Sequence, residues 1–234
     1  HDLDILRHLM RVNNAKKFHA SLDDLYERNL AKSNYVQAAL CLELLASTYD
    51  WNVEEELPIS IKPKFPAQTA FERKENLYKN IAANLVKGNK LEKAVLIYKE
   101  LSEAYDKINF NLKGLSFVHN KLSQLYLDLT TADRSTPTYF KVQFMGFGFP
   151  KTVRGRSFIY EGFTFEHINS IHNRLLRLHI GAQIISNDDE AAYLTENVPN
   201  GKYLHIVTVK PQMDFANNHG NLSSAARLYM ENKD

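Results

Sequence analysis

The sequence predicts an α+β fold, in which an N-terminal helical array is followed by a small antiparallel β-sheet lobe with one or two helices. Before residue 136, apolar residues recur at three- and four-residue steps, which is the spacing of one face of a helix. After that point, Phe140, Val142 and Phe144 alternate with polar residues, which is the two-residue period of a half-buried strand. We therefore expect a helical lobe over residues 1–136 and a β-rich lobe over residues 137–234.

The helical lobe is predicted from apolar stripes that are separated by short polar stops. Gly88-Asn89 supplies one stop, because both residues tolerate the left-handed conformation in which many helices end. Residues 52–68 carry three prolines and the acidic triplet 54–56, so we expect an exposed loop there, with the triplet as a solvated face. The expected helices cover residues 3–12, 18–30, 35–49, 71–86, 91–105 and 115–129.

Two of these stripes form a weak internal repeat. Ala38 aligns with Ala94, and Leu45 aligns with Leu101. Small alanines let the two helices of a pair approach closely, which is typical of tetratricopeptide-like repeats. The period is longer than in such repeats, so we expect an irregular array of helix pairs.

The β-rich lobe is predicted to begin with two strands, over residues 139–145 and 158–160. A long basic loop studded with aromatic residues joins them. Asn200-Gly201 is a turn signal that leads into residues 202–209, the strongest strand pattern in the chain. Residues 165–178 have the apolar spacing of a helix, and a short final helix is expected over residues 222–230, whereas residues 187–196 are only noted as polar and acidic.

Composition excludes several functional classes. With 29 basic and 27 acidic side chains, the formal charge of +2 gives no reason to expect binding to nucleic acid or to a membrane surface. The single cysteine, Cys41, cannot form an internal disulfide, and its apolar neighbours place it in the core, which suits a reducing cytosol. No apolar run approaches the ~20 residues of a transmembrane helix. The chain starts inside a helical pattern without a signal peptide, which we interpret as a piece of a longer protein.

Motifs for covalent or metal chemistry are not found in the sequence. His167 and His172 are five residues apart, which does not place both on one helical face. There is no glycine-rich phosphate loop and no His-Glu-x-x-His motif. We therefore predict no metal site, no cofactor and no catalytic residue.

The stretch that joins the two expected strands is distinctive as a string of residues. From Tyr139 to Gly162 it reads YFKVQFMGFGFPKTVRGRSFIYEG, which resembles the first hairpin of the β-rich lobe in the exchange domain of the dedicator-of-cytokinesis (DOCK) proteins. Further segments match the family in order and spacing: Asn34-Tyr35-x-x-Ala38-Ala39, Leu77-Tyr78, Lys87-Gly88-Asn89-Lys90, Lys99-Glu100-Leu101 and Thr208-Val209-Lys210-Pro211.

This resemblance implies a function. DOCK proteins are guanine-nucleotide exchange factors for Rho-family GTPases of the Rac or Cdc42 kind, and they promote GDP release by binding the nucleotide-free GTPase, without covalent chemistry. Their exchange domain has a helical lobe that dimerises, a β-rich lobe that holds the GTPase and a third lobe with a nucleotide sensor. Because the chain ends where the third lobe would begin, we expect this piece alone to exchange nucleotide poorly. The resemblance also implies an ELMO-like partner, cytoskeleton regulation, and a cytoplasmic protein that is recruited to the plasma membrane through other regions.

The basic loop is the predicted partner-binding site. Aromatic and arginine side chains are enriched in interface hot spots. Residues 139–180 contain six basic and two acidic residues, and this positive excess can either steer an acidic GTPase surface or face an anionic membrane. The alternative is that Phe149 folds inward and that the basic residues are ordinary loop solvation. The candidate residues are Phe147, Phe149, Lys151, Arg154 and Arg156.

The resemblance also implies a dimer interface on the last helices of the first lobe, with Leu122, Leu125, Tyr126 and Leu129 as candidates. The alternative is that this apolar stripe belongs to the core of the lobe itself. A rival reading of the whole chain is a helical-repeat adaptor that binds a protein partner on its concave surface. That reading predicts that charge changes at Arg154 and Arg156 leave GTPase binding unchanged.

Overall fold

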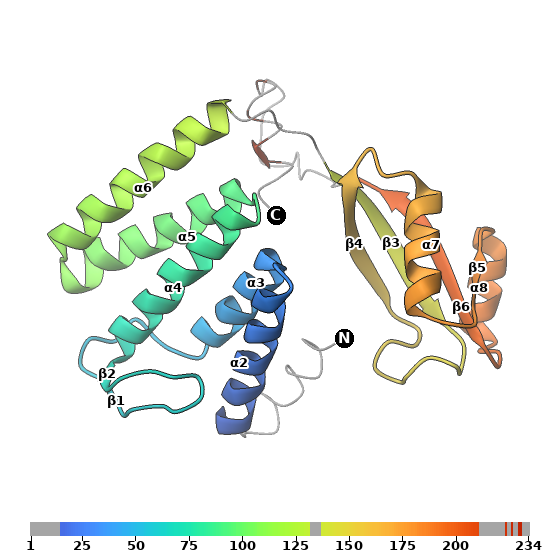
Figure 1. Cartoon of the computed structure of the whole chain (residues 1–234), viewed down its shortest axis with the longest axis horizontal. Helices are drawn as coiled ribbons and strands as arrows, with labels where there is room; N and C mark the ends of the chain where they lie inside the picture. The colour runs from blue at the N-terminus through green and yellow to red at the C-terminus, as the bar shows by residue number, and fades with distance from the viewer. Residues whose placement is uncertain (1–14, 132–136, 211–222, 224–225, 227–228, 231–234) are drawn as a thin grey trace. The chain divides into compact units, whose positions relative to one another are not determined.

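A computed structural model describes residues 15–131 and 137–210, together with residues 223, 226, 229 and 230 (Figure 1). Residues 15–131 and 137–210 belong to two compact units, which we name the helical unit (residues 15–131) and the β unit (residues 137–210), and residues 223, 226, 229 and 230 belong to the first of them. The predicted α+β fold class is confirmed, because helices fill the first unit and a sheet with helices forms the second. The helix expected over residues 3–12 lies outside the described residues, and the one expected over residues 222–230 lies mostly outside them.

The helical unit is an array in which each helix packs on the next one along the chain, from α2 to α6 (Figure 1). Such an array buries one face of each helix against its neighbour. A π-helical segment, η1, extends α5. The elements are α2 (Ala15–Ala31), α3 (Tyr35–Ala46), α4 (Ala70–Lys87), α5 (Leu91–Ala104), η1 (Tyr105–Asn109) and α6 (Leu112–Thr131).

The core of this array confirms the reasoning from small residues. Ala38 on α3 and Ala94 on α5 are fully buried, which allows close approach of the helices. Tyr105 is also fully buried, and its hydroxyl donates to the Glu75 carboxylate on α4 at 2.5 Å. Burial, and after it the bond to Glu75, raises the pKa of Tyr105 well above its ordinary value. Cys41 is buried in the same core, as predicted.

Residues 52–68 are more ordered than a plain loop. Two short strands, β1 (Glu56–Leu57) and β2 (Gln68–Thr69), pair antiparallel, and Ser60 bridges to Phe65. The expectation of an exposed loop was therefore incomplete, although the acidic triplet 54–56 is exposed as predicted. The prolines alone do not predict this hairpin. Its closure depends on Arg73 of the following helix, which donates to the carbonyl oxygens of Pro58 and Pro66.

The β unit contains a four-stranded sheet in the order β4-β3-β6-β5. β3 pairs antiparallel with both β4 and β6, whereas β5 runs parallel to β6 at one edge. The antiparallel core was predicted, and the parallel edge and α8 were not. The elements are β3 (Pro137–Met145), β4 (Ser157–Thr164), α7 (Ile168–Leu178), β5 (Ala182–Ile185), α8 (Asp188–Glu196) and β6 (Lys202–Val209).

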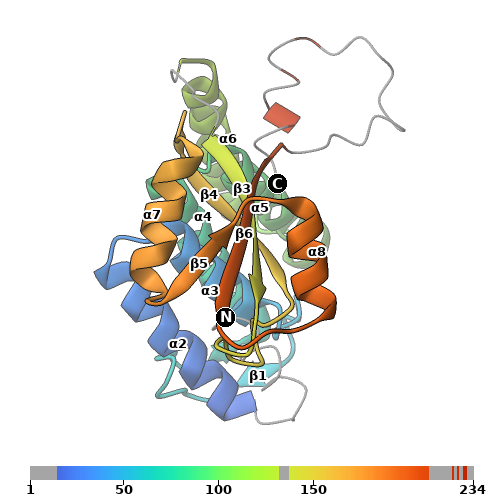
Figure 2. The same ribbon diagram turned by 90° about the vertical axis from the view of Figure 1, so that its right-hand side faces the viewer.

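α7 and α8 flank the strands (Figure 2). Ile171 and Leu175 of α7 pack on the face that carries Phe140, Val142 and Phe144. Ala191 of α8 packs in a smaller cluster around Met145 of β3. Since side chains alternate between the two faces of a strand, Met145 and Phe144 point to opposite sides of the sheet. Among the described helices, none combines the length and apolar character that crossing a membrane requires.

Candidate partner-binding site

The basic loop between β3 and β4 is pinned to the turn that precedes β6. The backbone N–H of Phe147 donates to Pro199 at 2.9 Å, and that of Gly148 donates to Gly201 at 2.7 Å. Gly146 has a φ of +95°, and a Cβ there would collide with the carbonyl oxygen of Gly201. Glycine at this position therefore allows the two backbones to approach closely.

Phe149 points into the core of the β unit. Its side chain is only 2% exposed, and its ring meets Phe144 edge-on at 5.1 Å and His179 at 5.4 Å between centroids. The inward packing that the sequence left open as an alternative therefore holds for this residue. Phe149 anchors the loop and is not part of its surface.

Arg154 fixes the outer part of the loop. Its Nη2 donates to the carbonyl oxygens of Phe149 at 3.0 Å and Phe147 at 3.2 Å. Its guanidinium carbon also lies 4.5 Å from the centroid of the Phe147 ring, which is a cation–π geometry. Phe147 is 55% exposed, so an ordered aromatic–arginine stack faces solvent.

Lys151 and Arg156 complete this exposed surface. We name the four residues Phe147, Lys151, Arg154 and Arg156 the basic loop surface. It presents an ordered arginine–aromatic pair and two further positive charges, a composition that suits contact with an acidic protein surface. The sequence analysis predicts all four of these residues, but it cannot show that Phe149, the fifth candidate, is buried.

His179, at the C-terminal end of α7, contacts the basic loop and has a lowered pKa. Its ring packs edge-on against both Phe144 and Phe149. Burial, and to a lesser extent the positive charge of Lys202, lowers the pKa of His179 below its ordinary value. The folded β unit thus resists protonation at this position more than the unfolded chain does.

A loss of stability in acid is the expected consequence. As the pH falls below about 6.5, the unfolded chain binds a proton at His179 before the folded chain does, so the free energy of unfolding decreases. Urea unfolding at about pH 7.5 and about pH 5.5 measures this decrease. In His179→Gln the decrease should be smaller, with a remainder from His172 and His19, whose pKa values are also lowered by burial. An equal decrease in both proteins would contradict this assignment.

The candidate dimer residues separate into two groups. Leu122 and Leu125 are 7% and 4% exposed and belong to the core of the helical unit, and Leu129 packs against that core. Tyr126, in contrast, is 42% exposed, and its neighbour Leu127 is 57% exposed. Leu127 was missed, although its position off the buried stripe was a usable signal.

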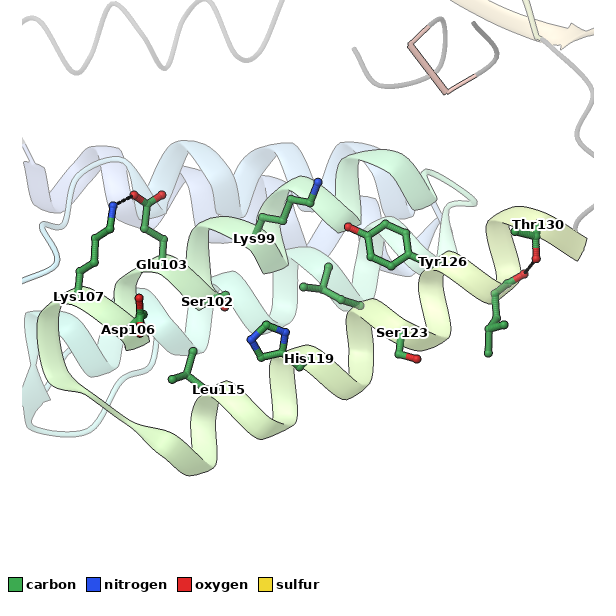
Figure 3. Close-up of a pocket in the computed structure, with 12 residues that line it drawn as sticks. Lys99, Ser102, Glu103, Asp106, Lys107, Leu115, His119, Ser123, Tyr126 and Thr130 are labelled. Atoms are coloured by element: carbon green, nitrogen blue, oxygen red, sulfur yellow. Dashed lines mark hydrogen bonds and ion pairs between the residues drawn. The ribbon is translucent and has the colours of Figure 1, made fainter. Parts of the chain in front are cut away.

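A groove of about 1010 Å³ lies between α5 and α6 beside these exposed residues (Figure 3). Tyr126 stands near Lys99 of α5, whose Nζ is 5.9 Å from the ring centroid, and the ion pair between Glu103 and Lys107 lies at the other end. His119 lies between them. The lining residues are Lys99, Ser102, Glu103, Asp106, Lys107, Leu115, His119, Leu122, Ser123, Tyr126, Leu127 and Thr130.

Within residues 15–131 and 137–210, no three His, Cys, Asp or Glu side chains gather in a way that could hold a metal ion.

Comparison with known proteins finds relatives that align with most of the chain. No family model matches it. The chain is 43% identical to DOCK-like protein 1 of Saccharomyces cerevisiae over 99% of its length. It is 26% identical to dedicator of cytokinesis protein 4 of Homo sapiens over 86% of its length, and 25% identical to dedicator of cytokinesis protein 3 of Mus musculus over 87%. The chain spans only 10 to 12% of the length of these relatives.

Proposed function

The chain belongs to the dedicator-of-cytokinesis (DOCK) family, and from this premise we propose that it is part of a guanine-nucleotide exchange factor that binds a Rho-family GTPase of the Rac or Cdc42 kind. The observation that carries the proposal is the 43% identity to DOCK-like protein 1 over 99% of the chain. We assign to this chain the binding and orientation of the GTPase.

The basic loop surface supports this assignment. Arg154 is held by two carbonyl oxygens and stacked on Phe147, so little side-chain entropy is lost when a partner covers this pair. Lys151 and Arg156 add charge that would accelerate encounter with an acidic GTPase surface. The surface is thus organised before the partner arrives.

The proposed mechanism is differential binding. An exchange factor shifts the GTPase toward its nucleotide-free state only if it binds that state more tightly than the GDP-loaded state. The same coupling makes GDP weaken the complex. No covalent step on either protein is involved, so the chain acts as a regulator of an enzyme.

Charge reversal tests the role of the basic loop surface. Lys151→Glu combined with Arg156→Glu should slow association with the GTPase about tenfold or more at low salt, with a smaller effect at high salt. Arg154 is left unchanged, because it also holds the loop. Lys16→Glu combined with Lys32→Glu, in the helical unit, makes the same change in net charge and should have little effect. Unchanged association of the loop variant would favour the adaptor reading.

We also propose that the helical unit forms a homodimer through the exposed side chains of α6, including Tyr126 and Leu127 in the groove beside α5. This terminal helix of the described array exposes Leu112, Phe117, Tyr126 and Leu127 to 64%, 41%, 42% and 57%. Terminal helices of such arrays usually need a polar outer face to stay soluble as monomers. Sedimentation velocity should show a dimer, and Leu127→Glu should convert it into a monomer. A monomer at all concentrations would refute this interface.

The remaining implications of the family are proposals of the same kind. We propose an ELMO-like partner, a cytoplasmic location with recruitment to the plasma membrane, and a role in cytoskeleton regulation for the protein that contains this chain. Imaging of that protein with a fluorescent tag, before and after GTPase signalling is stimulated, tests the location. A protein that never reaches the cell periphery would contradict the recruitment.

A further inference from the structure

The β unit contains a second hollow, separate from the basic loop surface. It has a volume of about 450 Å³ and lies between α8 and the sheet, and we name it the α8 pocket. Its floor comes from β3 and β6, and its wall comes from α8, where the small residues Ala191 and Ala192 leave room. The lining residues are Lys141, Gln143, Asp188, Ala191, Ala192, Thr195, Glu196, His205 and Val207.

Two groups converge in this pocket without satisfying each other. His205 is only 8% exposed, and within the described part of the chain its buried Nε2 has no hydrogen-bond partner. Asp188 Oδ1 lies 3.1 Å from this nitrogen, which is within ion-pair distance, but the geometry is not that of a hydrogen bond. In the neutral tautomer with its proton on Nδ1, the Nε2 of His205 is an acceptor, as the carboxylate is. Two acceptors then lie side by side, and a donor that displaces the exposed Asp188 side chain slightly would reach and satisfy both.

The charge around the pocket favours a cationic donor. α8 carries four acidic residues and no basic one, and two of the four, Asp188 and Glu196, line the pocket. The side chain of Asp188 is 88% exposed, so a partner can reach it. Lys141 supplies the positive charge in the lining. The acidic wall and the unpartnered nitrogen are independent observations that point to the same ligand chemistry.

We propose that the α8 pocket binds an arginine side chain that a protein partner inserts, and this rests on the function proposed above insofar as that partner is the GTPase. A guanidinium presents several N–H donors in a planar fork, so it can donate to Asp188 Oδ1 and His205 Nε2 together. Glu196 adds attraction at the rim. Gln143 donates to Thr195 Oγ1 at 3.0 Å, which fixes the amide beside the site.

The partner surface around this arginine is expected to be partly apolar. Lys141 in the pocket is the cross-strand neighbour of Ile159 on the edge strand β4. Ile159 is 63% exposed and lies on the same face of the sheet. A protein that covers Ile159 would therefore bring its side chains to the mouth of the pocket. A charged anchor beside buried apolar area is a common arrangement in interfaces.

A small probe tests the pocket without any partner protein. The isotope-labelled chain is titrated with N-acetyl-arginine amide and followed by NMR, with the neutral isostere N-acetyl-citrulline amide as a control ligand. We expect shifts confined to α8 and to residues 203–207 with the arginine probe, and a binding about tenfold weaker in Asp188→Asn. Asp189→Asn, in the same first turn of α8 but outside the pocket lining, should bind as the unchanged chain does.

Three outcomes would overturn the proposal: no localised shifts, equal binding of the citrulline probe, or equal binding by Asp188→Asn. The same two variants are then compared in GTPase binding, where only Asp188→Asn should weaken the complex. If the chain binds no Rho-family GTPase but still binds the arginine probe with this pattern, the proposed function fails and the pocket stands. If the GTPase binds and Asp188→Asn has no effect on either ligand, the pocket fails and the function stands.

Discussion

Replacing Phe149 with alanine is expected to lower the free energy of unfolding of the β unit by about 3 to 5 kcal/mol, the range found when a buried phenylalanine is truncated. The side chain is 2% exposed and lies edge-on to Phe144 and His179. Its removal leaves a cavity at the point where the basic loop joins the core. The loop surface should therefore lose its shape together with its anchor.

Phe147→Ala is the matched control, because it removes the same side chain two residues away. Phe147 is 55% exposed, so its loss should change the free energy of unfolding by less than about 0.5 kcal/mol. The control should instead weaken partner binding, since the ring carries the Arg154 stack. Urea unfolding followed by circular dichroism measures both variants. Equal stabilities of the two would contradict the inward position of Phe149.

Arg73→Ala is expected to lower the free energy of unfolding of the helical unit by about 2 to 4 kcal/mol. Arg73 is 4% exposed, and its Nη2 donates to the carbonyl oxygens of Pro58 at 2.9 Å and Pro66 at 3.1 Å. Its guanidinium carbon also lies 5.0 Å from the ring centroid of Phe65. One side chain thus closes the hairpin of residues 58–66 onto α4, and alanine would leave both carbonyl groups without this donor.

Arg28→Ala is the matched control for this variant. Arg28 is exposed, and its Nε donates to the carbonyl oxygen of Asp24 within the same helix at 3.2 Å. Its removal should cost less than about 0.5 kcal/mol. Hydrogen exchange of residues 56–69 locates the effect, because Arg73→Ala should deprotect the hairpin before the rest of the unit opens. Protection as in the unchanged chain would show that the hairpin does not depend on Arg73.

Long periodic segments of the fold were readable from the sequence. The apolar stripes of α4, α5 and α6 and the alternation in β3 reflect burial of one face, and burial is what selects those residues. The alanines at positions 38 and 94 likewise predict the close contacts between helices. These features are local, so a window of the sequence contains the information.

The short elements β5 and α8 could not be predicted from the sequence, and the reason is physical. β5 has four residues and no alternation of its own. It forms because it pairs in parallel with β6, which follows α8 in the chain. α8 buries only Ala191, so it shows no apolar stripe, although Asn187 is a good helix cap whose side chain accepts from Asp189 and Glu190. This cap is the one local signal in the sequence that favours α8.

The sequence predicts which residues the candidate site contains, but not which of their side chains are exposed and which are buried. Phe147 and Phe149 have the same chemistry in the same loop, and only the packing on Phe144 and His179 separates surface from core. In the sequence Arg154 looks like an ordinary surface charge. In the structure its hydrogen bonds to loop carbonyl groups also stabilise the loop. The α8 pocket could not be foreseen, because it joins β3, α8 and β6.

Binding to GTPases in defined nucleotide states tests the central claim most directly. The 234-residue chain is immobilised and exposed to Rho-family GTPases of the Rac and Cdc42 kinds, each prepared nucleotide-free and loaded with GDP. The account predicts that at least one member binds about tenfold or more tightly when nucleotide-free, which corresponds to about 1.4 kcal/mol of coupling, and that added GDP releases it. Equal affinity for both states, or no binding to any member, would contradict the account.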